Sequence, residues 1–136
     1  RDRIGDATPP ADATRQQALA AIGPSRLPAH PLIDISPEAR LAASFGQSLG
    51  DWLRLRFGRI DAVVDGVAAP TEEADIRLLL DWARENRVRI IPQGGATSVV
   101  GHLTPPDGSV VSCISIRSRS LQHSRPASPA RRSRRN

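Results

Sequence analysis

Lysine, methionine and tyrosine are absent from this 136-residue sequence, and cysteine occurs only once. The single cysteine, Cys113, excludes an internal disulfide and any metal site built from several cysteines. No apolar run reaches the roughly 20 residues of a membrane-spanning helix, and the N-terminus lacks the pattern of a signal peptide. We therefore expect a cytoplasmic protein. Because residue 1 is Arg and methionine is missing, we also expect a processed chain or an N-terminal fragment.

Acidic residues are missing from the last part of the chain, and this asymmetry explains the net charge of +5. All 19 basic residues are Arg, and all 14 acidic residues lie at or before Asp107. Residues 1–112 carry 12 Arg and all 14 acids, a net charge of −2, whereas residues 113–136 carry seven Arg and no acid. The high isoelectric point therefore belongs to the tail.

The first 60 residues predict a lead-in without strands. Residues 1–35 are expected to be mostly extended or disordered, with one short helix over 13–22 that Asp12 caps. Residues 36–60 are expected to be helical. Ser36 followed by Pro37 is a typical helix start, and Asp51 is expected to cap a second short helix over 52–57.

Residues 61–116 predict alternating strands and helices. Strands are expected at 66–69, 88–91 and 109–116. Between the first two, Thr71 is expected to cap a long helix that ends near Asn86. Its buried stripe is expected to consist of Ile76, Leu79, Leu80 and Ala83. The order of strand, helix, strand, Gly-rich loop and strand indicates an α+β fold, half of a sandwich.

Residues 117–136 are dominated by Ser, Arg, Pro and Ala, and we expect them to be disordered. The same bias is typical of a GC-rich gene translated in the wrong frame. Resequencing the gene tests this hypothesis, which fails if no other frame continues the strand pattern. An alternative function also rests on this tail: a non-enzymatic fragment whose arginines bind nucleic acid non-specifically. The tail has no aromatic residues for base stacking, which counts against it.

The stretch from Pro92 to Gly101 carries the chemistry. Two glycines, an alanine and two hydroxyl residues follow an apolar strand. A turn of such residues can point several backbone N–H groups at one phosphate, and Thr97 and Ser98 add hydroxyl donors. An ordinary Gly-rich turn between strands is the alternative. A Walker loop is excluded because it needs lysine, and the G-x-G-x-x-G fingerprint is excluded because no helix follows.

The loop, Pro92-Gln93-Gly94-Gly95-Ala96-Thr97-Ser98, resembles the P-x-G-G-G-T-S loop of the FAD-linked oxidases. Their FAD-binding domain is of the p-cresol methylhydroxylase and vanillyl-alcohol oxidase type. The preceding segment 65–73 is similar to the opening strand and helix start of that domain. Segment 45–58, with the sequence FGQSLGDWLRLRFG, resembles the branch that contains alkyldihydroxyacetonephosphate synthase.

This resemblance implies a partial FAD-binding domain over 61–116 that binds FAD through Pro92, Gln93, Gly94, Gly95, Ala96, Thr97 and Ser98. It implies a flavin-dependent oxidoreductase acting on a hydroxy acid, or an alkyl-glycerone-phosphate synthase-like enzyme, with a small-molecule substrate in the full-length family. The substrate domain is not in this chain, so we expect a fragment that is inactive alone, and we assign no catalytic and no metal-binding residue.

Two further residues near the loop affect this interpretation. Ala96 stands where the family has its third glycine. If that position requires a positive φ, Ala96 is strained by roughly 1–2 kcal/mol, and its methyl group crowds the phosphate. His102 is interpreted as a loop residue at the edge of the site, with covalent attachment of flavin as the minor alternative.

Overall fold

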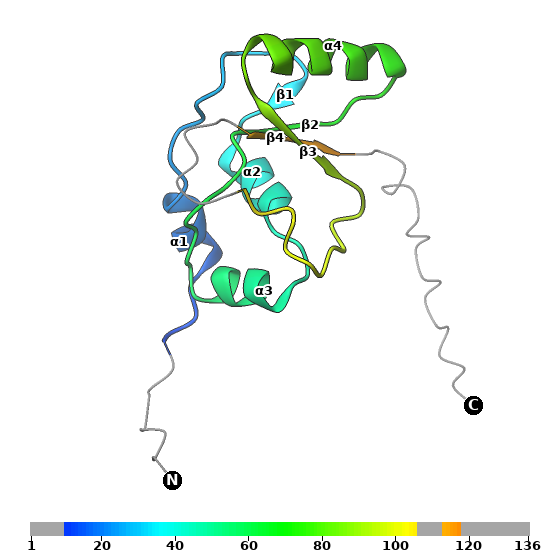
Figure 1. Ribbon diagram of the computed structural model, residues 1–136. Helices are drawn as coiled ribbons and strands as arrows, with labels where there is room; N and C mark the ends of the chain where they lie inside the picture. Colours follow the sequence, from blue (N-terminus) through cyan, green and yellow to red (C-terminus); the bar gives the residue numbers. More distant parts are fainter. Residues whose placement is uncertain (1–9, 106–112, 118–136) are drawn as a thin grey trace, which may run out of the picture.

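The computed structural model describes residues 10–105 and 113–117. The first nine residues, residues 109–112 of the predicted strand 109–116 and the predicted tail after Arg117 therefore lie outside the described residues, whereas Arg117 belongs to β4. Eight elements follow one another along the chain (Figure 1). They are α1 (Arg15–Ala20), β1 (Ile33–Asp34), α2 (Pro37–Ser44), α3 (Leu49–Arg56), β2 (Gly66–Ala68), α4 (Glu73–Glu85), β3 (Arg89–Gln93) and β4 (Cys113–Arg117).

The strands form one sheet in the order β1-β2-β4-β3. Strands β2, β4 and β3 are parallel, and Ile114 of β4 lies opposite Gly66 on one side and Ile90 on the other. Strand β1 pairs antiparallel with β2 and was not predicted, because two residues are too few to show a period. The expected order of strand, helix, strand, loop and strand is confirmed, and the fold is α+β.

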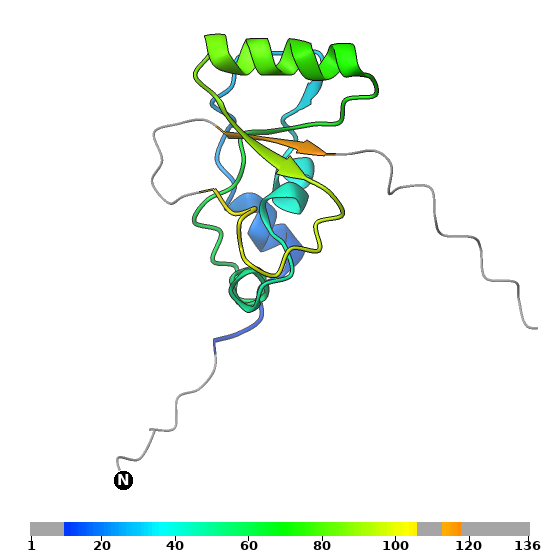
Figure 2. The same ribbon diagram turned by 45° about the vertical axis from the view of Figure 1, so that its right-hand side comes forward.

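Helices cover both faces of the sheet. Both views place α4 along one face, and α2 on the other with α1 and α3 beyond it (Figures 1 and 2). Under α4, Ala83 packs with Val88 and Ile114. Under α2, Ala43 packs with Val64 and Val67. Because successive side chains of a strand point to opposite faces, these short strands supply both clusters.

Two of the lead-in helices begin differently from the prediction. Thr14, not Asp12, caps α1, because Thr14 and Gln17 form a reciprocal capping box. Asp12 instead pairs with Arg56 at 2.7 Å. Helix α3 starts at Leu49 with Ser48 as its cap, so Asp51 lies inside its first turn and is free to bind elsewhere. The predicted start of α2, with Ser36 as the cap, is confirmed.

A carboxylate in the first turn of α4 stabilises the N-terminus of the helix. The prediction that Thr71 caps it is wrong: Glu72 is the N-cap and makes no side-chain capping bond. The carboxylate of Asp75 instead accepts the backbone N–H of Thr71 at 2.9 Å and its hydroxyl at 3.1 Å. The predicted end at Asn86 is confirmed, and the Asn86 side chain donates to the carbonyl of Trp82.

The predicted stripe of α4 is only half correct. Leu79 and Ala83 are buried, but Ile76 and Leu80 are 41% and 49% exposed. The lead-in covers α4 at Trp82, which His30 contacts, but Ile76 and Leu80 stay exposed among the described residues. None of the helices in this part of the chain is long and apolar enough to cross a bilayer.

Buried charges fasten the extended connection between α1 and β1 to the sheet. The Arg26 guanidinium forms an ion pair with Asp65 at 2.7 Å, and the Asp65 side chain is 3% exposed. Arg40, 4% exposed, donates to the carbonyls of Val64 and Gly23, both at 2.8 Å. Burial lowers the pKa of Arg40 from its ordinary value, with Asp65 opposing this change. These bonds hold the lead-in against the start of β2.

Candidate functional site: the loop after β3

The Gly-rich loop leaves the sheet at the carboxyl end of β3. In sheets with parallel strands, ligands bind beside these carboxyl ends. Strand β3 extends to Gln93, two residues beyond the predicted end at Ile91, so Pro92 and Gln93 belong to the strand. The Gln93 side chain is 4% exposed and accepts from the Ser115 hydroxyl and the Arg117 guanidinium at 3.2 and 3.0 Å. Its side chain therefore joins two strands, and the part of the loop outside the sheet starts at Gly94.

The next four residues leave their backbone donors free. Within the part of the chain that the structure describes, no backbone N–H of residues 95–98 donates a hydrogen bond. Gly95 and Thr97 are exposed, whereas Ala96 and Ser98 are half-buried. Backbone N–H groups are strong donors that folded proteins almost always satisfy. Consecutive free donors in an exposed turn are what a phosphate-binding nest requires.

No contact with another described residue explains why position 94 is a glycine. A Cβ placed at Gly94 would meet no atom within 4 Å, and its φ is not in the left-handed region. Neither packing nor backbone strain therefore requires glycine here. Open space above the backbone is what a bound ligand would fill, so the loop fits an anion that approaches closely.

Ala96 has a φ of 56°, in the left-handed region. The condition under which alanine is strained at this position is therefore met. The Cβ of alanine is strained in this conformation by roughly 1–2 kcal/mol. The turn holds this shape despite that strain.

The loop hydroxyl groups differ in their surroundings. Thr97 is exposed. Ser98 Oγ lies 2.8 Å from Nδ1 of His102, which orients the hydroxyl from the side of the loop. The place of His102 at the edge of the site stays a prediction, and its contact with Ser98 was not predicted. The spacing of four residues was the only signal, and in a loop it does not imply contact.

The other side of the loop is held by residues 46–51. The backbone N–H of Gln47 donates to the Ser98 carbonyl at 2.6 Å, and Thr104 Oγ1 donates to Asp51 Oδ1 at 3.0 Å. A Cβ at Gly46 would lie 2.5 Å from the Ser98 carbonyl oxygen, so only glycine fits there. This contact could not be predicted along the chain, because about 50 residues separate the partners.

Asp51 is the buried centre of this contact, at 1% exposure. Its Oδ2 accepts the Gly46 N–H at 3.1 Å, while its Oδ1 accepts from Thr104. Burial raises the pKa of Asp51, but the hydrogen bonds from Ser48, Thr104 and Gly46 together outweigh burial and lower it from its ordinary value. The carboxylate is therefore ionised at neutral pH.

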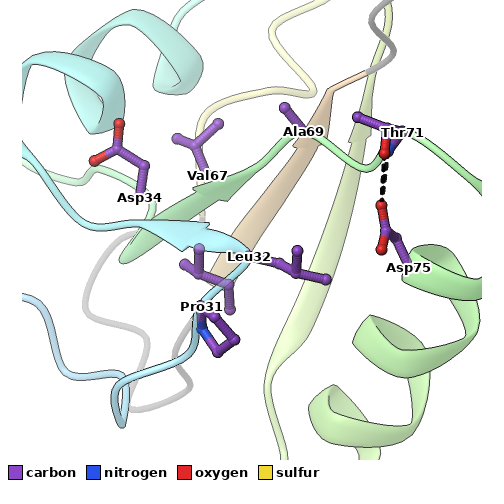
Figure 3. A pocket seen from close by; sticks show the side chains of 8 residues that line it. Pro31, Leu32, Asp34, Val67, Ala69, Thr71 and Asp75 are labelled. Atoms are coloured by element: carbon purple, nitrogen blue, oxygen red, sulfur yellow. Dashed lines mark hydrogen bonds between the residues drawn. The ribbon is translucent and has the colours of Figure 1, made fainter.

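A pocket of about 400 Å³ lies elsewhere, between β1, the end of β2 and the start of α4 (Figure 3). Asp34 and Asp75 both line it. The pKa of Asp34 is lowered by the Ser36 backbone N–H, and that of Asp75 by the Thr71 backbone N–H. Two ionised carboxylates disfavour phosphate, so this pocket does not compete with the loop as an anion site.

Other residue types add no chemistry in the described ranges. No three His, Cys, Asp or Glu residues within 10–105 and 113–117 are grouped as metal ligands. His30, to which the sequence assigned no role, packs against Trp82 with ring centroids 5.1 Å apart. Trp52 of α3 is 61% exposed.

Comparison with known proteins relates the loop to a family. The family model described as an FAD binding domain matches residues 64–125. This match includes all of β2, α4, β3, the loop and β4, and nine residues of the predicted tail.

Curated relatives agree with this match. The chain is 34% identical over 67 residues to alkyldihydroxyacetonephosphate synthase of Dictyostelium discoideum, covering 49% of this chain and 11% of the relative. The enzyme of the same name from Caenorhabditis elegans is 35% identical over 86 residues, covering 62% and 14%. The mitochondrial D-lactate dehydrogenase [cytochrome] of Arabidopsis thaliana is 40% identical over 52 residues, covering 38% and 9%. The chain thus spans about a tenth of these relatives.

Solved structures support the fold. A structure of alkyldihydroxyacetonephosphate synthase superimposes with a TM-score of 0.59 at 24% identity, covering 81% of this chain and 20% of the other. A second one gives 0.59 at 27% identity with the same coverage. The fold is therefore that of the p-cresol methylhydroxylase-type domain. The nucleic-acid alternative gains no support from any of these relatives.

Proposed function

The chain carries part of an FAD binding domain of the FAD-linked oxidase family, and we propose that residues 94–98 bind the pyrophosphate of FAD. The observation that carries this proposal is the set of free backbone N–H groups at residues 95–98. The open space at Gly94 lets a ligand approach these donors without meeting a side chain. Of the predicted residues, Pro92 and Gln93 act by fixing the start of the loop.

Thr97 and Ser98 add hydroxyl donors at the end of the same turn. The Ser98 hydroxyl can donate to a phosphate oxygen while His102 Nδ1–H donates to Ser98 Oγ, since the two atoms are 2.8 Å apart. A hydroxyl oriented in advance loses less entropy on binding than a freely rotating one. The loop therefore combines backbone and side-chain donors on one anion.

The activity of the longer protein is a further proposal. Bound FAD supplies the redox chemistry of flavoenzymes, and the protein orients cofactor and substrate. The relatives act, by their names, as an alkyldihydroxyacetonephosphate synthase and a D-lactate dehydrogenase. We propose an oxidoreductase of this type with a small-molecule substrate. The described residues offer no general base or nucleophile, so this chain alone is expected to be inactive. A cytoplasmic location stays a prediction.

Titration of the purified chain with FAD, followed by flavin fluorescence, tests the binding proposal. FAD should bind, and ADP should compete because it carries the same pyrophosphate. Riboflavin, which has no phosphate, should bind far more weakly. Equal binding of riboflavin and FAD, or failure of ADP to compete, would contradict a pyrophosphate site.

A further inference from the structure

Residues 47–51, at the start of α3, contact the loop at two points, Ser98 and Thr104. The Ser98 carbonyl accepts the Gln47 N–H at 2.6 Å. Six residues later, the Thr104 hydroxyl donates to Asp51 at 3.0 Å. Between these points the backbone turns at Gly101, which has a φ of 74°. The second half of the loop is thus fixed at both ends by residues 47–51.

Asp51 connects these two points through one carboxylate. Its Oδ2 accepts the N–H of Gly46, the residue packed against the Ser98 carbonyl, while its Oδ1 accepts from Thr104. The group is 1% exposed, and no buried polar side-chain atom of the described residues lacks a partner. Hydrogen bonds to a buried carboxylate are charge-assisted and stronger than neutral ones.

Capping of α3 does not explain why a carboxylate is buried at position 51. Ser48 caps α3 and accepts the backbone N–H of Asp51 at 3.1 Å, so the helix start is complete without the carboxylate. A direct contact with phosphate is also ruled out, since two anions repel each other. What remains is the bond to Thr104, which joins a helix in the lead-in to the loop 53 residues away.

We propose that Asp51 is a positioning residue of the pyrophosphate loop, acting through Gly46 and Thr104 to hold residues 95–98 in their ligand-binding shape. This deepens the proposed function and rests on it for the role in FAD binding. Holding the loop before the ligand arrives reduces the ordering cost of binding. The lead-in thereby becomes part of the cofactor site without touching the cofactor.

The test uses the full chain and the matched variants Thr104→Val and Thr104→Ser. Valine has the shape of threonine without the hydroxyl, whereas serine keeps the donor to Asp51. Amide hydrogen exchange is measured by NMR in the free protein. With Thr104→Val, the amides of Gly46 and Gln47, which donate to Asp51 and to the Ser98 carbonyl, should exchange about tenfold faster, while amides 86–88 after α4 stay unchanged. Thr104→Ser should keep the wild-type rates.

FAD affinity provides the second readout. Thr104→Val should weaken FAD binding about tenfold, and Thr104→Ser should recover most of it. Asp51→Asn, which keeps the shape but loses the charge, should accelerate exchange in the same amides. If it fails to fold, the Thr104 pair still decides.

Three results would overturn the positioning role: unchanged exchange of the Gly46 and Gln47 amides in Thr104→Val, equal exchange in the valine and serine variants, or a parallel rise at amides 86–88, which indicates general destabilisation. A different result would count against the proposed function alone. If the wild-type chain does not bind FAD but Thr104→Val still accelerates exchange of the Gly46 and Gln47 amides, Asp51 positions the loop and the loop is not an FAD site.

Discussion

The two connections that flank β3 contrast with each other. Helix α4 leads into β3 through a tight turn at Arg87, and the Gly-rich loop leaves β3 through a turn at Ala96. Both residues have a φ of 56°. Next to Arg87 the backbone donors are used: Val88 N–H donates to Ala83 at 2.8 Å and Asn86 N–H to Trp82 at 3.0 Å. Next to Ala96, within the described ranges, they are not.

The first turn has its backbone donors hydrogen-bonded within the fold, whereas the second turn has donors that are available to a ligand. The first turn satisfies its own hydrogen bonds and needs nothing further. The second is held firmly on its outer side by residues 46–51 and left open on its inner side. Substitutions on the outer side should therefore affect stability, and FAD binding only through the shape of the loop, whereas those on the inner side should affect FAD binding directly.

The largest effect is expected on the outer side. Gly46→Ala places a methyl group 2.5 Å from the Ser98 carbonyl oxygen, so the backbone must move. The free energy of unfolding should fall by about 1–3 kcal/mol, the usual cost of overpacking. Gly50→Ala is the control, because its Cβ meets nothing closer than 3.8 Å and it lies in α3. It should stabilise the chain by about 0.5–1 kcal/mol. Urea unfolding measures both changes. Equal changes in the free energy of unfolding for Gly46→Ala and Gly50→Ala would contradict the tight contact on the outer side of the loop.

On the inner side, Gly94→Ala should reduce FAD affinity at least tenfold, about 1.4 kcal/mol. The methyl group occupies the space that the ligand needs, while the fold itself tolerates it. Gly23→Ala is the matched control, since its Cβ also meets nothing within 4 Å but lies far from the loop in sequence and binds no proposed ligand. Both variants should unfold no more easily than wild type. Equal FAD titrations of the two variants would show that Gly94 does not face the cofactor.

A smaller effect is expected at the two strained residues. Ala96→Gly and Arg87→Gly should each raise the free energy of unfolding by roughly 0.5–1 kcal/mol, because relief of the left-handed strain exceeds the entropy cost of glycine. Only Ala96→Gly should also tighten FAD binding, since its methyl group crowds the phosphate. Thermal unfolding with and without FAD measures both changes. An FAD-dependent gain in Arg87→Gly would contradict the distinction between the turns.

The smallest effect concerns pH. Because the folded pKa of Asp51 lies below its unfolded value, its contribution is present above the ordinary carboxyl pKa and is lost as pH falls through the folded value. The free energy of unfolding should therefore decline below about pH 4. In Asp51→Asn the decline should be shallower but still present, because the pKa values of Asp34 and Asp75 are lowered too. Parallel pH profiles would show that Asp51 does not contribute.

The sequence predicted the elements whose signals are local. Ser36 with Pro37 marked the start of α2, Asn86 marked the end of α4, and the glycines marked the loop. The comparison of Ala96 with the third glycine of the loop left its φ open, and the structure gives a φ of 56°. Such features depend on a few neighbouring residues and can be read along the chain.

Features that depend on distant partners were missed. Asp12 and Asp51 both suit a helix cap, but the fold uses them as partners of Arg56 and Thr104. Gln93 also joins β3 to β4, a contact that was not predicted, while its assignment to the cofactor stays a prediction. The division of the chain at residues 35, 60 and 116 stays a prediction.

The most direct test of the central claim is to map FAD binding residue by residue, using the backbone amide NMR signals of the full chain during titration. The amides of residues 94–98 should shift most, and ADP should reproduce these shifts. The amides of residues 86–88, in the closed turn, should not move. Shifts centred on the pocket at Asp34 and Asp75, or equal shifts in both turns, would contradict a pyrophosphate site in the loop after β3.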